Sequence, residues 1–561
     1  MSQSAKQVAA AAREAVQRGD AEAAQRMLAA GLAQYPEDLG LLGQAASLAL
    51  RRGNYADAIA LYTRAVAEAP ANADLGIDLA IALTSGGDPR KALETLMPLE
   101  QLGGQTPRYW SVRANAARAC GDMGQAATSY ARCLALQPDH PRAMHGSARV
   151  ALERGDDRAT QLFDRALRAM PSEADLWLGK AQALDAAGRS REALDLTQQL
   201  VDRAPQWIDA LNLLAQLRSA AGDADFDERF REATKRLPHN ADIPAAHIQQ
   251  LTARESYAEA AEIAAEASAR FASQPFFALS HAASLGMAGE LDEADRLFAE
   301  LAFTGPQRSL QEGRQRLRRG DMERAQELLL EAAAAPETAH TAYALLGSLW
   351  RLTRDQRAFW LHEQVGLVAT VELPLDEHAT GGVVELLGRL HDRSDFPVGQ
   401  SLRGGTQTRH VLFHRHEPEL QQLHRAIEEG LETYRTALPP ADPVHPLLRH
   451  RDDPWTLAGS WSVRLKGGSD RHASHIHPQG MLSSALYLVV PETDGGQGCL
   501  EIGRPPPDLR LDLEPLHIIQ PHVGRLALFP STLFHGTTPF DAGERMTVAF
   551  DVVPVIGQAH G

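Results

Sequence analysis

Three histidines and an arginine near the C-terminal end of the chain have the residue types and spacing of a metal-binding site. His475 and His477 stand two residues apart in an HxHP segment just before a strand-like run, so both imidazoles can project from one side of an extended backbone. His535 follows 58 residues after His477, directly behind another strand-like run, and Arg545 comes ten residues later. Because imidazole binds several transition-metal ions, this set predicts a metal centre held between strands.

Short strand-like runs surround these residues. They are rich in β-branched and apolar residues and are separated by turn-forming segments such as Asp494-Gly495-Gly496. One helix is predicted from Glu417 to about Thr436, with apolar side chains on one side. The predicted strands lie within residues 461–465, 484–490, 525–529 and 546–553. The pattern favours an all-β barrel or jelly roll with a helical flank.

In these segments the sequence resembles the 2-oxoglutarate- and iron-dependent oxygenases. The resemblance covers residues 390 to 554 and rests on the HxHP segment, an LFPSxxxH segment, a Glu-Arg pair that opens the last strand, and a lead-in over residues 400–408. It implies a double-stranded β-helix (jelly roll) that uses Fe(II), 2-oxoglutarate and O2. By position, His475 matches the first iron ligand and His535 the distal ligand. Arg545 matches the cation that pairs with the far carboxylate of 2-oxoglutarate, a task that suits the planar guanidinium fork.

The sequence departs from the wider family pattern at His477, which stands where a carboxylate ligand is usual. Three imidazoles can hold ferrous iron, so we expect His477 to be the third metal ligand, although such a site has one negative charge less. The alternative is that a nearby acid, Glu501 or Asp494, completes the site. The hydroxyls of Ser483 and Tyr487, on the strand after His477, are candidates for binding the co-substrate, and Tyr487 is equally suited to packing.

Two other interpretations concern the histidines. His414-Arg415-His416 also forms an HxH pair, but it precedes a helix and lacks the following strand and the spaced arginine, so we expect no metal there. Similar histidine sets bind zinc or nickel in cupin barrels, which share the jelly-roll architecture. Arg545 favours a 2-oxoglutarate user over a cupin of that kind.

The first half of the chain carries a repeat with a period close to 34 residues. A glycine permits a tight turn, a small residue five positions later lets two helices approach closely, and in several units a proline ends the second helix. The array resembles the tetratricopeptide repeat family over residues 5 to 335, which implies a superhelix whose concave wall binds peptides or partner proteins. The alternative is a spacer or a dimerisation surface. The marking residues are Gly19, Gly53, Gly87, Gly121, Gly155, Gly188, Gly222, Ser256, Gly289 and Gly320.

The amino-acid composition indicates which classes of partner and which cellular compartment are expected. The formal net charge is -16, which argues against broad attraction to nucleic acid or anionic lipid. The three cysteines form no CxxC pair, which argues against a disulfide framework or a thiolate zinc site. No apolar signal core and no run of about 18 uncharged apolar residues occurs. We therefore expect a soluble cytoplasmic protein that binds neither nucleic acid nor membrane.

These patterns together predict an α + β multidomain protein. A TPR-like helical solenoid is expected over residues 1–370, a junction over 371–400 and the jelly-roll domain over 401–561. The expected function is hydroxylation of a protein or peptide side chain recruited by the repeats, with small-molecule hydroxylation as an alternative. Two rival classes are a non-catalytic scaffold with a degenerate oxygenase domain, and a cupin-type metal enzyme that does not use 2-oxoglutarate.

Overall fold

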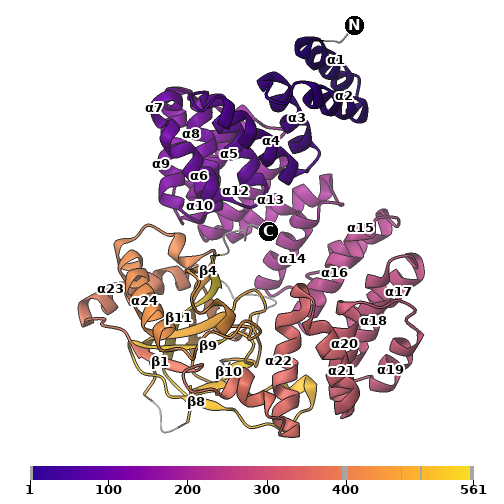
Figure 1. Ribbon diagram of the computed structural model, residues 1–561. Helices are drawn as coiled ribbons and strands as arrows, with labels where there is room; N and C mark the ends of the chain where they lie inside the picture. Colours follow the sequence, from indigo (N-terminus) through magenta and orange to yellow (C-terminus); the bar gives the residue numbers. More distant parts are fainter. Residues whose placement is uncertain (1–3, 395–401, 469, 493–495, 556–561) are drawn as a thin grey trace. The chain divides into compact units, whose positions relative to one another are not determined.

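The computed structural model describes residues 4–394, 402–468, 470–492 and 496–555 (Figure 1). The chain forms two compact units: unit 1 is Met1–Ala183 with His414–His416, and unit 2 is Leu184–Phe413 with Glu417–Gly561. All strands among the described residues belong to unit 2. Within the described part of the chain, none of the helices combines the length and apolar character that crossing a bilayer requires.

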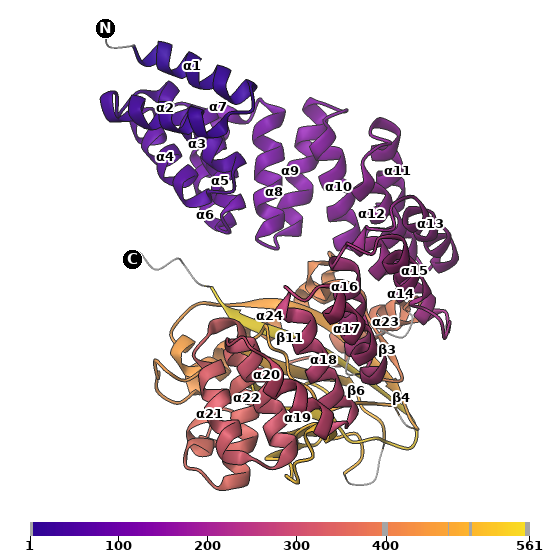
Figure 2. The same ribbon diagram turned by 90° about the vertical axis from the view of Figure 1, so that its right-hand side faces the viewer.

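Unit 1 is built from short helices that pack side by side in pairs (Figure 2). Their buried faces carry alanine and leucine at helical spacing, so neighbouring helices approach closely. The helices are α1 Ala5–Gln17, α2 Ala21–Gln34, α3 Leu39–Arg51, α4 Tyr55–Glu68, α5 Ala73–Ser85, α6 Pro89–Leu96, α7 Glu100–Gly103, α8 Pro107–Ala119, α9 Met123–Leu136, α10 Pro141–Glu153 and α11 Ala159–Ala169; the boundary between the units falls within α12, Ala174–Ala186.

The glycines and alanines that mark the repeat have the structural roles predicted from their residue types. Gly19 and Gly53 lie in the turn between the two helices of a pair with φ of 82° and 77°, a conformation that L side chains disfavour. Ala24 and Ala58, five positions later, are completely buried between helices. The predicted helical repeat array is therefore confirmed.

One unit departs from the glycine rule. The residue with left-handed backbone is Glu255, at φ 62°, whereas Ser256 caps the helix α17, Tyr257–Arg270. The prediction that Ser256 takes the glycine slot is wrong by one residue. A side chain in this conformation costs about 1 kcal/mol, and the Glu255 carboxylate forms an ion pair with Arg403.

The helical array continues in unit 2 and ends in a π-helical turn. The helices are α13 Ser190–Arg203, α14 Ile208–Ala220, α15 Glu228–Arg236, α16 Asp242–Ala253, α17 Tyr257–Arg270, α18 Pro275–Ala288, α19 Leu291–Glu300, α20 Pro306–Arg319, α21 Met322–Ala333 and α22 Pro336–Thr353, followed by the π-helical turn η2, Phe359–Glu363. Two further helices, α23 Glu377–Asp392 and α24 Pro418–Ala437, lie between strands of the β-domain in sequence. The helix predicted from Glu417 to about Thr436 is α24.

The strands of unit 2 pair antiparallel throughout the described residues. A six-stranded sheet has the order β1-β9-β6-β11-β4-β3, a three-stranded sheet has the order β10-β7-β8, and β2 pairs with β5. The strands are β1 Ala369–Glu372, β2 Leu402–Arg403, β3 Thr406–Gln407, β4 Trp455–Lys466, β5 Arg471–His472, β6 Leu482–Val489, β7 Leu500–Ile502, β8 His517–Ile519, β9 Arg525–Pro530, β10 His535–Thr537 and β11 Glu544–Pro554.

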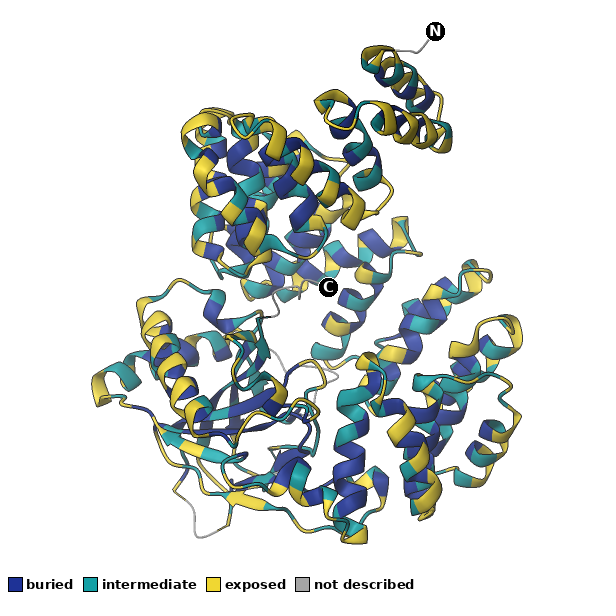
Figure 3. Ribbon diagram, in the orientation of Figure 1, coloured by how far each residue is buried: buried dark blue, intermediate teal, exposed yellow. Residues whose placement is uncertain are grey.

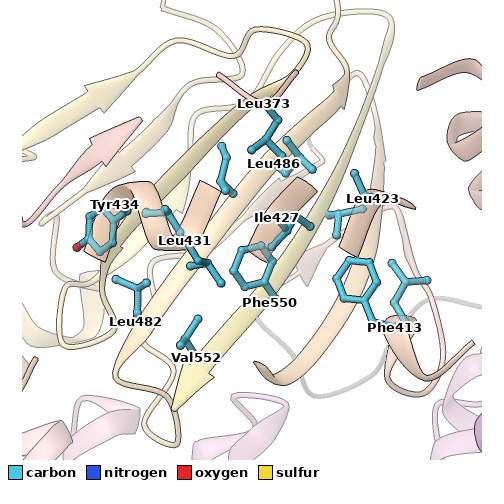
Figure 4. Packing of buried hydrophobic residues seen from close by; sticks show 14 of the residues in the cluster. Leu373, Phe413, Leu423, Ile427, Leu431, Tyr434, Leu482, Leu486, Phe550 and Val552 are labelled. Carbon is cyan, nitrogen blue, oxygen red and sulfur yellow. The ribbon is translucent and has the colours of Figure 1, made fainter. Parts of the chain in front are cut away.

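The six-stranded sheet presents two chemically different faces because successive side chains of a strand alternate. On β11, Phe550 and Val552 face α24 and pack with Ile427 and Leu431 (Figure 4). The alternate side chains of β11, among them Arg545, line a cavity on the other face. The central strands are buried on both faces (Figure 3). The sheet therefore separates an apolar core from a polar cavity.

The three-stranded sheet packs onto the cavity side of the larger one. Leu500 and Ile502 of β7 form a buried cluster with Ala527 and Phe529 of β9. Two antiparallel sheets packed in this way agree with the predicted jelly roll. Within the predicted junction, residues 371–372 belong to β1 and α23 packs into the sheet core; residues 395–400 lie outside the described residues.

Candidate metal centre

The start of β10 and an isolated β-bridge bring the three predicted histidines together. His535 begins β10, and His475 lies opposite it in an isolated antiparallel bridge. The two residues exchange backbone hydrogen bonds: the His475 amide donates to the His535 carbonyl at 3.0 Å, and the reverse bond is 2.9 Å. One ligand nitrogen from each of His475, His477 and His535 lies within 4.8 Å of the other two. Among the described residues, no other group of histidine, cysteine or acidic side chains meets this criterion.

Each imidazole is oriented by a hydrogen bond at its Nδ1 atom. His475 Nδ1 lies 2.8 Å from the Ala473 carbonyl oxygen, and His535 Nδ1 lies 3.1 Å from that of Leu533. A carbonyl only accepts, so Nδ1 carries the proton and Nε2 keeps its lone pair. The Nε2 atoms of His475 and His477 are 3.0 Å apart. Two lone-pair nitrogens this close fit a shared cation better than they fit each other.

Burial keeps His475 and His535 neutral, which is the form that binds a metal. Burial lowers the pKa of His475 to about 3, and the neighbouring His477 acts in the same direction. Burial also holds the pKa of the His535 imidazole well below its usual range, again helped by the other two histidines. Unprotonated nitrogens are therefore presented to the cavity near neutral pH.

The third imidazole has a carboxylate behind it. His477 Nδ1 lies 2.6 Å from Asp551 Oδ1, and the two side chains are 17% and 15% exposed. The Ser483 hydroxyl donates to the same carboxylate oxygen at 3.1 Å and lies 2.8 Å from the Ser531 hydroxyl. A carboxylate in this position fixes the ring and makes its free nitrogen more basic. The negative charge that the ligand set lacks is thus one hydrogen bond away.

Of the two acids predicted as alternative ligands, only Glu501 is described, and it is not part of the triad cluster. Both Glu501 carboxylate oxygens accept hydrogen bonds from the Arg504 guanidinium, at 3.0 and 3.2 Å. Glu501 belongs to β7, where it is paired with Gly536 and Ile518. Asp494 lies outside the described residues.

The triad opens into a cavity of about 630 Å³. Arg545 lines it and is 2% exposed; its Nη1 donates to the Gly498 carbonyl at 2.8 Å, while its buried Nε has no hydrogen-bond partner. Burial lowers the pKa of Arg545 and raises that of Tyr487, another lining residue, to about 12. An unpaired guanidinium N–H in a closed site is costly, so Arg545 is suited to an anionic ligand.

The structure assigns different surroundings to the other predicted residues. Ser483 is buried and engaged with Asp551 and Ser531, whereas Tyr487 lines the cavity. Sequence reasoning overlooked Asp551 and His472. Asp551 could have been found from strand alternation, since it is six residues after Arg545 and therefore on the same face of β11. His472 lines the cavity from β5, a two-residue strand that has no recognisable pattern.

The fold and the site together define a chain in which a helical repeat array precedes an antiparallel β-domain with a histidine triad at its cavity. Residues 459–551 match the family model described as "Putative 2OG-Fe(II) oxygenase". Residues 49–116 and 157–217 match one tetratricopeptide repeat model, and residues 9–73 match another. The chain thus carries tetratricopeptide repeats and a C-terminal domain of this oxygenase family. No curated protein matches the chain.

Solved structures of several proteins are similar to part of the chain. A tetratricopeptide repeat protein from Parabacteroides merdae is 19% identical over 44% of this chain and 98% of its own, with a TM-score of 0.37. A thermophilic repeat protein of Thermus thermophilus is 23% identical over 32% and 99%, with a TM-score of 0.28. The pilF protein of Pseudomonas aeruginosa is 18% identical over 36% and 94%, with a TM-score of 0.31.

Proposed function

We propose that the protein is an Fe(II)- and 2-oxoglutarate-dependent dioxygenase that hydroxylates a side chain of a protein or peptide recruited by the repeats. The observation that carries this proposal is the juxtaposition of three imidazoles with a buried, incompletely paired arginine in one cavity. A metal and an anionic co-substrate need these two features together. The family match at residues 459–551 supports the same assignment.

His475, His477 and His535 would hold Fe(II) through Nε2, because each Nδ1 is engaged elsewhere. Bound iron would supply the redox chemistry that couples oxidative decarboxylation of 2-oxoglutarate by O2 to C–H hydroxylation, with succinate, CO2 and the alcohol as products. The chain's own part is to orient the reactants and to exclude water. Phe529 and Trp461 form apolar parts of the cavity wall.

Arg545 would bind the far carboxylate of 2-oxoglutarate. Its Nη1 is fixed by the Gly498 carbonyl, which leaves the Nε edge available for a second acceptor. Burial strengthens this charge-assisted contact because water does not compete. Tyr487 lines the same cavity and is suited to donate a further hydrogen bond. We assign Ser483 instead to holding Asp551, since its hydroxyl is already bonded there.

The repeats would bind the substrate protein and present it to the cavity. Tetratricopeptide repeats are interaction modules, and a helical array offers an extended surface on which a peptide can be held. Binding energy from such remote contacts lowers the barrier when it positions the reacting group. A side chain presented by a docked protein is therefore the substrate class that we favour over a free small molecule.

The test is an anaerobic titration of the Fe(II)-loaded protein with 2-oxoglutarate, followed by its visible charge-transfer band. We expect a band in the wild type, its loss in His535→Ala and a raised 2-oxoglutarate Kd in Arg545→Ala. His522→Ala and Arg525→Ala, which alter partly or largely exposed residues of the same domain, serve as matched controls and should leave the band intact. Bound iron without any band would contradict the 2-oxoglutarate assignment and favour a scaffold or another metal enzyme.

A further inference from the structure

The last helices of the repeat array pack directly onto the segments that carry the histidine triad. Trp350 of α22 and Leu361 of η2 belong to one buried cluster with Phe534. Ile476 packs against the same cluster. Phe534 immediately precedes His535, and Ile476 lies between His475 and His477. The array therefore supports two of the triad's backbone segments from behind.

A polar contact accompanies this packing. His362 of η2 is 2% exposed, and its Nε2 lies 3.0 Å from the hydroxyl of Thr532, three residues before His535. Gly347 of α22 makes room for the ring: a Cβ there would collide with the His362 imidazole. Burial lowers the pKa of His362 to about 3, so the imidazole stays neutral and bonds the hydroxyl without introducing a charge.

A further histidine, His340, belongs to α22. The Nε2 of His340 is buried without a hydrogen-bond partner. Burial lowers the pKa of His340, while the Ser531 backbone and the Asp551 carboxylate act in the opposite direction. Ser531 and Asp551 are joined through the Ser483 hydroxyl, and Asp551 holds His477.

We propose that α22 and η2 are part of the metal site, with His362 acting through Thr532 as a positioning residue for the segment that ends in His535. The proposal rests on the proposed function, because it assumes that the triad binds a metal. Residues that orient ligands typically change metal affinity by about 10- to 100-fold when altered. Thermodynamic linkage makes this effect reciprocal. If the packing of α22 and η2 on the β-domain raises metal affinity, bound metal stabilises that packing by the same free energy.

The first test compares Co(II) affinity in variants, followed by ligand-field absorption. Thr532→Val keeps the side-chain shape and removes the hydroxyl that His362 bonds, so we expect about 10-fold weaker Co(II) binding; Thr532→Ser should restore it. Tyr434→Phe is the matched control: it also removes one fully buried hydroxyl, bonded at 2.7 Å to the Leu367 carbonyl, on the opposite face of the sheet. Unchanged affinity in Thr532→Val, or equal weakening in Tyr434→Phe, would overturn the proposal.

The second test uses amide hydrogen exchange with and without Co(II). We expect the metal to slow exchange in α22 and η2 more than in α24, although both helices pack on the β-domain. Thr532→Val should reduce this selective protection. Equal protection of α22 and α24 would mean general stabilisation of the domain and would contradict the coupling. If the wild type binds no Co(II) at all, the proposed function itself fails, which is a separate outcome.

Discussion

At the scale of single residues, the notable feature is where the negative charge sits. Asp551 contributes no ligand atom to the triad but accepts the Nδ1 proton of His477 at 2.6 Å. An imidazole that donates to a carboxylate carries more electron density on its free nitrogen. A site of three histidines can thereby approach the donor strength of one with two histidines and a carboxylate.

We predict that Asp551→Asn weakens Fe(II) or Co(II) binding by about 10- to 100-fold. The amide oxygen can still accept the His477 proton, so the ring keeps its orientation while the negative charge is lost. Metal titration of the purified protein gives the affinity. Asp541→Asn, an exposed substitution in the same domain, is the control. Equal affinities for wild type and Asp551→Asn would show that the carboxylate only orients the ring.

At the scale of elements, one buried histidine adds polar contacts to the apolar packing of α23 on the sheet. His391 is 1% exposed and contacts the hydroxyls of Ser462 on β4 and Thr406 on β3, at 3.0 and 2.9 Å. Burial lowers the pKa of His391 to about 3, and Arg464 acts in the same direction. The helix is thus docked by the neutral form of the ring.

This docking predicts acid sensitivity. In the unfolded chain His391 has its ordinary pKa near 6.5, so protonation favours unfolding as pH falls from about 6.5 towards 3, by up to about 1.4 kcal/mol per pH unit. We expect the free energy of unfolding of His391→Gln to depend less steeply on pH over this range. Urea unfolding between about pH 7 and about pH 4 measures this dependence. The exposed His522→Gln should leave the slope as it is. An unchanged slope in His391→Gln would contradict the prediction.

Several elements of the fold could be predicted from the sequence alone. Strand runs around Val463, Leu486 and Leu528, the helix α24 and the repeat period follow from alternation and spacing, and all are present. Glu255 was missed because the spacing of the marking residues from Gly19 to Gly289 varies between 33 and 34, so spacing alone fixes the slot only to within one residue. Strand alternation puts Asp551 on the cavity face, but its contact with His477 depends on the segment between β5 and β6, which no local pattern encodes.

At the scale of the whole molecule, unit 2 joins repeats and β-domain through charged contacts as well as apolar ones. Arg314 and Arg318 of α20 both donate to one carboxylate oxygen of Asp508, at 2.9 and 2.8 Å, and Arg318 is 7% exposed. Arg351 of α22 donates to the carbonyls of Gly503 and Glu514. The later repeats and the β-domain therefore form one compact unit.

We predict that Asp508→Ala lowers the free energy of unfolding of unit 2 by about 3 kcal/mol, because it leaves the Arg318 guanidinium buried without its anion. Denaturant unfolding followed by tryptophan fluorescence measures the change. The control is Glu432→Ala, which removes a largely exposed ion pair with Arg435 and should cost less than about 0.5 kcal/mol. Equal effects of the two substitutions would contradict a buried docking role for Asp508.

The position of β11 in the sheet has a consequence for the order in which the protein is made. β11 carries Arg545 and Asp551, and although it is the last strand described, it is inserted between β4 and β6. Helical repeats depend on neighbouring contacts and can fold while synthesis proceeds, whereas the sheet cannot close before its central strand leaves the ribosome. The cavity wall that β11 supplies is therefore completed only when translation has passed Asp551.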